Sequence, residues 1–252
     1  MISLPDGVVL SAETGHPHRS YVWSGEQSLN VAAAIRSLLK PGCVFLDVGA
    51  FSGQHSIRAS RLVGESGLVV AFEPDPRVLG RFRRNILESG GPFPNLLIRE
   101  HAVVHHRSGT AVLHLNEEIS MSSLHPDSGE TVDSIEVEAV SFLEVLNEFK
   151  PDLIKLDIEG AEAAILDTLA GENLDFQPVF IIEDNPGVRD SVHRLGWEFF
   201  TTEMLTQGRR KVSNFSHDII AAPAGTVNLE PFREIFHTNL AALSVAPEFR
   251  FV

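Results

Sequence analysis

Carboxylates follow four apolar segments of this sequence, each long enough to form a buried strand. Because ionised carboxylates are rarely buried without partners, their repeated place at predicted strand ends indicates a shared polar site. In an open α/β sheet, ligands bind beyond the carboxyl ends of the strands, where the strand order reverses. Carboxylates there can exchange protons or supply oxygen ligands to a cation. The residues at these ends are Asp47, Glu73, Asp157, Glu159, Glu183, Asp184 and Asn185.

Gly49 and Gly53 connect the first of these strands to the helix that follows. Glycine permits positive φ and a close approach of the backbone to a ligand, and the amides that open the helix can hold an anionic group. The spacing is G-x-x-x-G and differs from the G-x-G-x-x-G of dinucleotide sites, which argues against a pyrophosphate site. A plain tight turn is the alternative interpretation.

Glu73 lies at the end of the next strand, 24 residues after Gly49. An acid at this place in a nucleotide-binding sheet accepts hydrogen bonds from the ribose hydroxyls. The alternative is an acid that caps the helix beginning near Pro76. Together with the glycine turn, Glu73 predicts an adenosine-type ligand without a pyrophosphate.

The elements that must position these residues alternate between short apolar runs and amphipathic stretches, which predicts an α/β fold. Uninterrupted apolar strands indicate one doubly wound, mostly parallel sheet covered on both faces. The polar residues 116–134 predict a mobile loop between two strand extensions, 111–115 and 135–140. We predict helices over 28–39, 53–63, 141–149 and 161–170 and from Pro76 onward, and strands over 43–48, 68–73, 95–104, 152–157, 178–183, 197–201 and 217–222.

Three segments divide the chain: an N-terminal extension over 1–27, a main domain over 28–225, and a helical tail over 226–252. The tail has helix-like apolar spacing. It is expected to pack on the domain or to form a subunit contact in a homo-oligomer.

Composition excludes several classes of protein. An apolar fraction of 43% in 252 residues excludes a disordered chain, and a single cysteine excludes a disulfide scaffold. The net charge of −14 argues against a nucleic-acid partner and favours a small molecule. No apolar run reaches the ~18 residues of a membrane span. Since Met1 to Gly7 lacks the basic residues of a signal peptide, we expect a cytoplasmic protein.

The order and spacing of these motifs resemble the FkbM-type family of S-adenosylmethionine-dependent methyltransferases. The similarity covers roughly residues 26 to 222, and it departs from the family pattern at Phe51, where an Asn is usual. The matching runs are LDVGA (46–50) with Gly53 and Ser56, AFEP (71–74), SSL (122–124) and DLIKLDIEGAE (152–162).

This resemblance implies the seven-stranded, Rossmann-like sheet of class I methyltransferases, with S-adenosylmethionine as cofactor. It implies that Asp47 and the glycine turn hold the methionine end, that Glu73 holds the ribose, and that His101 and Ala102 flank the adenine. Glu26 resembles an acid that precedes this domain in relatives. The full set of expected cofactor-binding residues is Glu26, Asp47, Gly49, Ala50, Gly53, Ser56, Glu73, Pro74, His101, Ala102 and Asp157.

Methyl transfer from a sulfonium is an in-line displacement, so the acceptor must be oriented and an alcohol must lose its proton. A positioned base is one way to remove that proton. The candidates are Asp157 and Glu159, both of which can face the site if Gly160 bends the chain, together with Glu183 and His125.

A bound Mg²⁺ that lowers the pKa of the hydroxyl is the other way. Asp157, Asp184 and Asn185 resemble the ligand set of catechol-type O-methyltransferases, and such oxygen ligands suit a hard cation. Lys155 lies inside an apolar strand, where it needs a partner. We expect it to pair with a carboxylate such as Glu159 or Glu162.

Four functions remain open. The leading one is O-methylation of a hydroxyl on a small metabolite, such as a sugar or a natural product. N-methylation of a small molecule is the second, and a non-catalytic nucleotide-binding protein is the third. A nicotinamide-dependent dehydrogenase is the fourth, and the missing third glycine argues against it.

Overall fold

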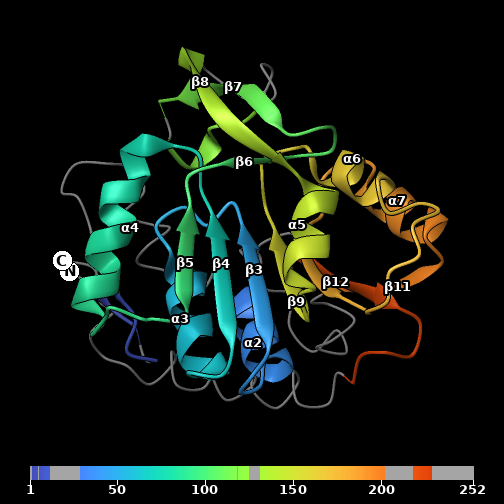
Figure 1. The fold of residues 1–252 in the computed structure, drawn as a ribbon, viewed down its shortest axis with the longest axis horizontal. Helices are drawn as coiled ribbons and strands as arrows, with labels where there is room; N and C mark the ends of the chain where they lie inside the picture. The colour runs from blue at the N-terminus through green and yellow to red at the C-terminus, as the bar shows by residue number, and fades with distance from the viewer. Residues whose placement is uncertain are drawn as a thin grey trace.

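A seven-stranded sheet forms the centre of the computed structural model, which describes residues 2–4, 6–11, 29–117, 119–124, 131–201 and 218–228. The strand order is β11-β12-β10-β9-β3-β4-β5 (Figure 1). Five neighbouring strands run parallel, and β12 is antiparallel to both of its neighbours, which confirms a mostly parallel, Rossmann-like sheet. The strands are β3 (Val44–Val48), β4 (Leu68–Phe72), β5 (Leu96–Arg99), β9 (Leu153–Leu156), β10 (Val179–Glu183), β11 (Trp197–Thr201) and β12 (Asp218–Pro223).

The strand order reverses between β3 and β9. From β3 the chain moves outward through β4 to β5, and it later returns to the other side of β3 with β9. Val48 and Leu156 are paired at the carboxyl ends of these two strands, so the loops that follow them lie side by side. This is the place where an open α/β sheet binds its ligand.

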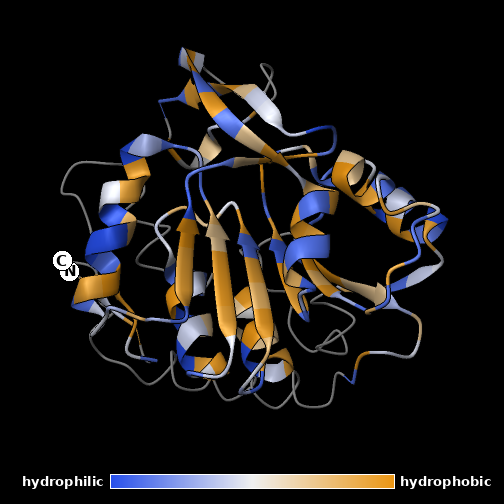
Figure 2. Cartoon of the chain, viewed as in Figure 1, coloured by the Kyte–Doolittle hydropathy of each residue, from blue (hydrophilic) through white to orange (hydrophobic). Residues whose placement is uncertain are grey.

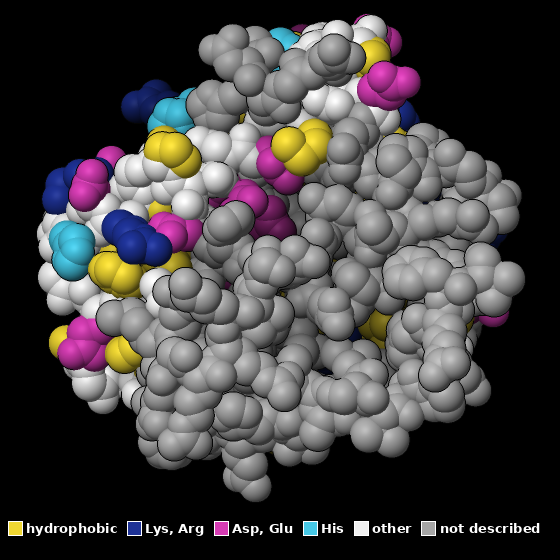
Figure 3. Space-filling model, turned by 180° about the vertical axis from the view of Figure 1, so that it is seen from behind, with side chains coloured by type: hydrophobic (Ala, Val, Ile, Leu, Met, Phe, Trp, Pro, Cys, Tyr) yellow, Lys and Arg dark blue, Asp and Glu magenta, His cyan; other side chains and the backbone are white. Residues whose placement is uncertain are grey.

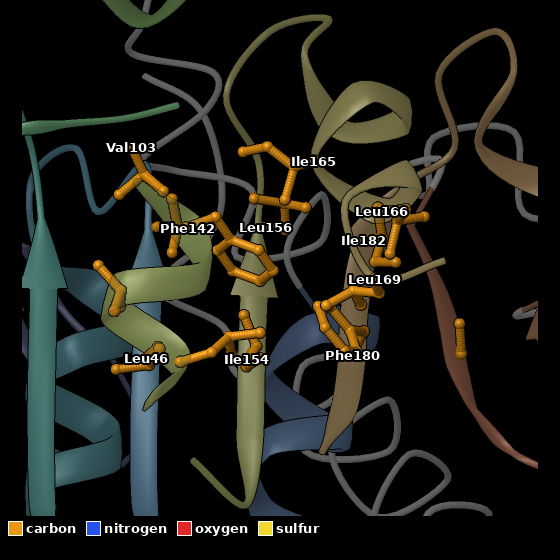
Figure 4. Close-up of a cluster of buried hydrophobic side chains, with 14 of the residues drawn as sticks. Leu46, Val103, Phe142, Ile154, Leu156, Ile165, Leu166, Leu169, Phe180 and Ile182 are labelled. Atoms are coloured by element: carbon orange, nitrogen blue, oxygen red, sulfur yellow. The ribbon is translucent and has the colours of Figure 1, made fainter. Parts of the chain in front are cut away.

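Helices cover both faces of the sheet, because the central strands are apolar on both sides (Figure 2). One hydrophobic cluster joins the sheet to α5, α6 and α7, and Figure 4 shows Phe142 of α5 beside Leu156 and Ile154 of β9. A second cluster joins the opposite face to α2 and α3. The helices are α2 (Leu29–Leu38), α3 (Gln54–Val63), α4 (Pro76–Glu88), α5 (Phe142–Phe149), α6 (Glu162–Asp167) and α7 (Val188–Arg194).

A separate three-stranded sheet, of order β6-β8-β7, corrects the expectation of a single sheet. The predicted strand 95–104 is two strands, because the chain leaves the main sheet after Arg99 and forms β6 (Ala102–Val104). The predicted strand extensions are β7 (Gly109–Asn116) and β8 (Thr131–Ser141), and η1 (Ile119–Met121) lies within the predicted loop. This small sheet crosses the main sheet at the carboxyl ends of β3, β4 and β5 (Figure 1).

A short hairpin, β1 (Ile2–Ser3) with β2 (Val9–Leu10), precedes the main domain and packs against it. The Ser11 amide and hydroxyl both donate to Asn85 Oδ1 of α4 at 2.8 Å. Most of the predicted extension and nearly all of the predicted tail lie outside the described residues. Among the helices of the described ranges, none has the length and apolar character that a membrane crossing requires.

Candidate active site

The turn after β3 requires glycine at two positions. Gly49 and Gly53 both have φ of +79°, in the left-handed region. A Cβ on Gly49 would lie 1.8 Å from the carbonyl oxygen of Asp157, and one on Gly53 would lie 1.9 Å from the ring of Phe82. The turn therefore packs directly against the loop after β9 on one side and against α4 on the other.

Three amides of this turn bond within the protein, and the predicted role of the amides that open α3 in holding an anionic group stays a prediction. The N–H groups of Gly49 and Ala50 donate to the carbonyl of Phe72 at 3.1 and 3.0 Å. The N–H of Gly53 donates to the carbonyl of Ala50 at 2.9 Å. The absence of side chains at Gly49 and Gly53 makes the turn suited to a close approach of a ligand.

Glu73 lies directly after β4, and its side chain faces the glycine turn. Its Oε2 accepts from the Phe51 amide at 2.7 Å, and its Oε1 accepts from the Asp75 amide at 2.9 Å. Burial raises the pKa of Glu73 to about 7, although these two hydrogen bonds act in the opposite direction. Each oxygen retains acceptor capacity for a further donor. The alternative role as a helix cap is wrong, because Asp75 caps α4 and accepts from the Arg77 amide at 2.9 Å.

Asp47 and Ser56 face each other inside the domain. The Ser56 hydroxyl donates to Asp47 Oδ2 at 2.5 Å, and both residues are fully buried. Burial raises the pKa of Asp47, and the Lys155 ammonium partly offsets this. Among the residues that the structure describes, Asp47 Oδ1 has no hydrogen-bond partner and lies 3.8 Å from Lys155 Nζ. In this arrangement the two residues support the turn from beneath, and their contact with the cofactor stays a prediction.

Lys155 joins the two loops at the point where the strand order reverses. Its Nζ lies 2.9 Å from Asp157 Oδ2 and donates to the Gly49 carbonyl at 3.2 Å. The expected carboxylate partners were Glu159 or Glu162, and the structure corrects them to Asp157 and Asp47. Burial lowers the pKa of Lys155, but these two carboxylates outweigh it and raise the pKa overall, so the ammonium stays charged.

Asp157, Glu159 and Glu183 form an acidic cluster at the ends of β9 and β10, with one oxygen of each within 4.8 Å of the others. The chain bends sharply after β9, with φ of +59° at Glu159 and +110° at Gly160, so both acids of this loop reach the same place. Burial and the nearby Asp157 raise the pKa of Glu159 to about 8. The same causes raise the pKa of Glu183 to about 7.

Two of the three expected metal ligands, Asp184 and Asn185, bond to other side chains, and the expected set of Asp157, Asp184 and Asn185 stays a prediction. The Asp184 carboxylate binds the Arg189 guanidinium, with an Oδ2 to Nη2 distance of 2.5 Å. The Asn185 amide nitrogen donates to Glu183 Oε2 at 2.8 Å, so it faces a carboxylate as a donor. Within the described part of the chain, the oxygen set that fits a hard cation is the acidic cluster.

Two buried residues hold the loop after β9, a role that sequence reasoning did not give them: it named Glu162 as a possible partner of Lys155 and Ser123 as part of a family motif. Glu162 accepts hydrogen bonds from the amides of Ile158 and Gly160 at 2.8 and 3.0 Å. The Ser123 hydroxyl, which comes from the segment beside the small sheet, donates to the Glu159 carbonyl at 2.8 Å. The sequence did not predict the contacts of Glu162 with the loop, because an acid at the start of a helix normally indicates only a favourable interaction with the helix dipole.

His101 lies between the main sheet and the small sheet, next to the buried Ala102. Its Nε2 is 3.0 Å from Glu138 Oε2. Its Nδ1 is buried without a hydrogen-bond partner among the described residues. Pro74 is partly buried beside Glu73. Glu26 and His125, the remaining predicted site residues, lie outside the described residues.

Acidic side chains gather near the middle of the face seen from behind in Figure 3. They agree with the negative character of the strand ends, where Asp218 of β12 also pairs in register with Glu183. The site thus combines a glycine turn, a buried acid after the second strand and an acidic cluster across the reversal of strand order. This arrangement suits a nucleoside that carries a positive charge and no phosphate.

The sheet defines a Rossmann-like domain, and a comparison with protein families makes the class specific. The model of the FkbM methyltransferase domain matches residues 47–204, which is more than half of the chain. The chain belongs to this family, as its motifs predicted.

The chain is also similar to individual proteins, but only over a short segment or at low sequence identity. A segment of 61 residues is 38% identical to a probable cobalt-precorrin-6B C(15)-methyltransferase (decarboxylating) of Sulfolobus acidocaldarius and spans 24% of this chain and 32% of that relative. The crystal structure of a precorrin-6Y C5,15-methyltransferase from Geobacter metallireducens aligns with a TM-score of 0.46 and 17% identity over 84% of this chain and 92% of that one. A fibrillarin of Aeropyrum pernix with natively bound S-adenosylmethionine aligns with a TM-score of 0.46 and 15% identity over 79% and 76%.

Proposed function

We propose that this methyltransferase transfers a methyl group from S-adenosylmethionine to a hydroxyl of a small metabolite, such as a sugar or a natural product. The observation that carries the proposal is the acidic cluster beside the glycine turn. It offers carboxylates with pKa values of about 7 and 8, so they can accept a proton near neutral pH. A general base works best when its pKa is near the pH at which the enzyme operates.

The residues after β3, β4 and β5 fit the cofactor chemically. Glu73 has acceptor capacity for two ribose hydroxyls, and the partly exposed His101, just after β5, is the proposed neighbour of the adenine. The glycine turn leaves the backbone free of side chains where the methionine portion would lie. When bound, the cofactor supplies a methyl group on a positively charged sulfonium. The surrounding carboxylates are electrostatically compatible with that charge.

Glu159 and Glu183 are the proposed proton acceptors, and Asp157 pairs with Lys155. An acceptor hydroxyl that donates to one of these carboxylates would be oriented and deprotonated in the same contact. An anionic acceptor group is disfavoured, because it would raise the repulsion among the acids of the cluster whenever Glu159 or Glu183 loses its proton. An amine is disfavoured as well, because the cluster would hold it as an ammonium, which has no lone pair for the methyl group.

The oxygen atoms of the cluster also suit Mg²⁺, which would lower the pKa of the acceptor hydroxyl. Exhaustive chelation separates the two ways of removing the proton. If the side chains alone do so, methyl transfer continues at its original rate in EDTA. Loss of transfer in EDTA and its recovery with added Mg²⁺ would assign the step to the metal instead.

The function is tested in two stages with the full chain. Titration calorimetry should show binding of S-adenosylhomocysteine and no binding of NAD. A panel of sugars and phenolic or polyketide-like alcohols is then incubated with cofactor labelled on its methyl group. Transfer to a hydroxyl is the expected result. Transfer to amines alone, or binding without any transfer, would contradict the proposal.

A further inference from the structure

Glu162 is the first residue of α6, and its side chain is fully buried beneath the acidic cluster. Its carboxylate accepts three hydrogen bonds from groups on two different loops. Hydrogen bonds to an ionised acceptor are about twice as strong as bonds between neutral groups. Glu162 is therefore placed to hold both loops at once.

Two of these bonds set the shape of the loop after β9. The amide of Ile158 donates to Oε1 and the amide of Gly160 donates to Oε2, so the carboxylate spans the residues on both sides of Glu159. Glu159 has a positive φ of 59°, which a residue with a side chain rarely adopts without support. The contact thereby turns the Glu159 carboxylate toward Asp157.

The third bond reaches the loop after β10. The Asn185 amide nitrogen lies 3.0 Å from Glu162 Oε2 and 2.8 Å from Glu183 Oε2, so it bridges the two carboxylates. The Asn185 amide thus links the side chain of Glu183 to Glu162, which shapes the loop after β9.

We propose that Glu162 is the positioning residue of this site, because it fixes the loop after β9 directly and Glu183 through Asn185, and so makes the three acids converge. The inference rests on the proposed function, in which these acids face the acceptor. Glu162 itself does not contact the reacting atoms. Its effect should appear in turnover far more than in cofactor affinity, since Glu73 and the glycine turn make no bond to it.

Glu162→Gln tests this in the full chain, with Glu144→Gln on the exposed side of α5 as the matched control. Glutamine has a single acceptor oxygen, so in either orientation its amide nitrogen faces a backbone N–H of this loop, that of Ile158 or that of Gly160, and at least one of these bonds is lost while the volume is kept. Amide hydrogen exchange over residues 157–161 should accelerate by about tenfold or more, as expected for loss of a charge-assisted bond. The affinity for S-adenosylhomocysteine should stay within about threefold, and kcat for the acceptor found in the screen should fall by about 10²-fold.

The outcomes separate the two proposals. Unchanged exchange in Glu162→Gln overturns the inference whether or not an acceptor is known. Faster exchange with unchanged kcat also overturns it, because Glu162 would then be only structural. A wild-type chain that binds no S-adenosylhomocysteine contradicts the proposed function, and the exchange experiment still decides whether Glu162 holds the loop.

Asn185→Ala provides a second variant in case Glu162→Gln fails to fold. It leaves the Glu162 bonds to Ile158 and Gly160 in place and removes only the bridge to Glu183. Exchange over 157–161 should match the wild type, while kcat falls with little change in the KM for S-adenosylmethionine. A wild-type kcat in this variant would contradict the proposed role of the Asn185 bridge in turnover.

Discussion

Glu73 is a buried acid whose two oxygens already accept backbone amides and, in the proposed function, also accept the ribose hydroxyls. Glu73→Gln would place an amide nitrogen against one of those backbone donors and remove the charge. Because a hydrogen bond to a charged acceptor contributes roughly 1.5–3 kcal/mol, the affinity for S-adenosylhomocysteine should fall about 10- to 100-fold. Titration calorimetry measures this directly. Glu100→Gln, at an exposed acid paired with Arg83, is the control and should bind as the wild type does.

The raised pKa of Glu159 predicts how the stability of the ligand-free protein depends on pH. The folded state holds a proton on Glu159 up to about pH 8, whereas the unfolded chain releases it near the ordinary value of 4.5. Between about pH 4.5 and 8 the folded state binds this proton and the unfolded chain does not, so the free energy of unfolding decreases as the pH rises through this range and levels off above it. Buried His55, whose pKa is lowered, acts in the opposite direction only below its ordinary value of 6.5.

Thermal melts of the wild type and Glu159→Gln between pH 6.5 and 8.5 check this expectation. The variant cannot ionise at this position, so its melting temperature should decline less over the range and exceed that of the wild type at the upper end. Parallel curves for the two proteins would show that Glu159 does not carry the effect.

At the scale of elements, Gly53 at the start of α3 packs against Phe82 of α4. A Cβ on Gly53 would overlap the Phe82 ring, and the residue has a positive φ. Gly53→Ala should destabilise the protein by about 2–5 kcal/mol, since overpacking costs about 1–3 kcal/mol and a left-handed backbone adds about 1–2 kcal/mol.

Combining Phe82→Leu with Gly53→Ala in one chain shows whether the Phe82 ring or the backbone conformation causes the loss of stability. If the ring is the obstacle, the double variant is more stable than the sum of the two single changes implies, when measured by urea denaturation. Additive effects within about 0.5 kcal/mol would show that backbone strain alone is responsible.

The sequence predicted the elements of the main sheet well, because its strands are uninterrupted apolar runs and its glycine turn is local. It could not separate β5 from β6, since Glu100 and His101 interrupt an otherwise continuous strand pattern and the departure of β6 depends on tertiary pairing with β8. It also missed α7, which is short. The strand-end acids were named correctly as a group, but which of them converge depends on Glu162 and on the positive φ at Glu159.

At the scale of the whole molecule, the N-terminal hairpin is tied to the main domain by a buried ion pair between Asp6 and Arg58. The Arg58 side chain is only 6% exposed. Asp6→Asn would leave this guanidinium without its counter-charge, which typically costs about 3–5 kcal/mol. Asp167→Asn breaks the exposed pair with Arg194 and should cost about 1 kcal/mol or less. Denaturant unfolding of both variants tests this, and equal losses would contradict a structural role for the hairpin.

The contact between Gly49 and the carbonyl of Asp157 has a consequence for anyone who redesigns this enzyme. A library that varies position 49 should yield almost no functional clones, because any larger residue displaces the loop that carries Asp157 and Glu159. Diversity aimed at new acceptors is better directed to the solvent-facing positions of β7 and β8, such as Val112 and Val132, whose side chains are about half exposed. Directed evolution would then explore substrates while the catalytic geometry stays intact.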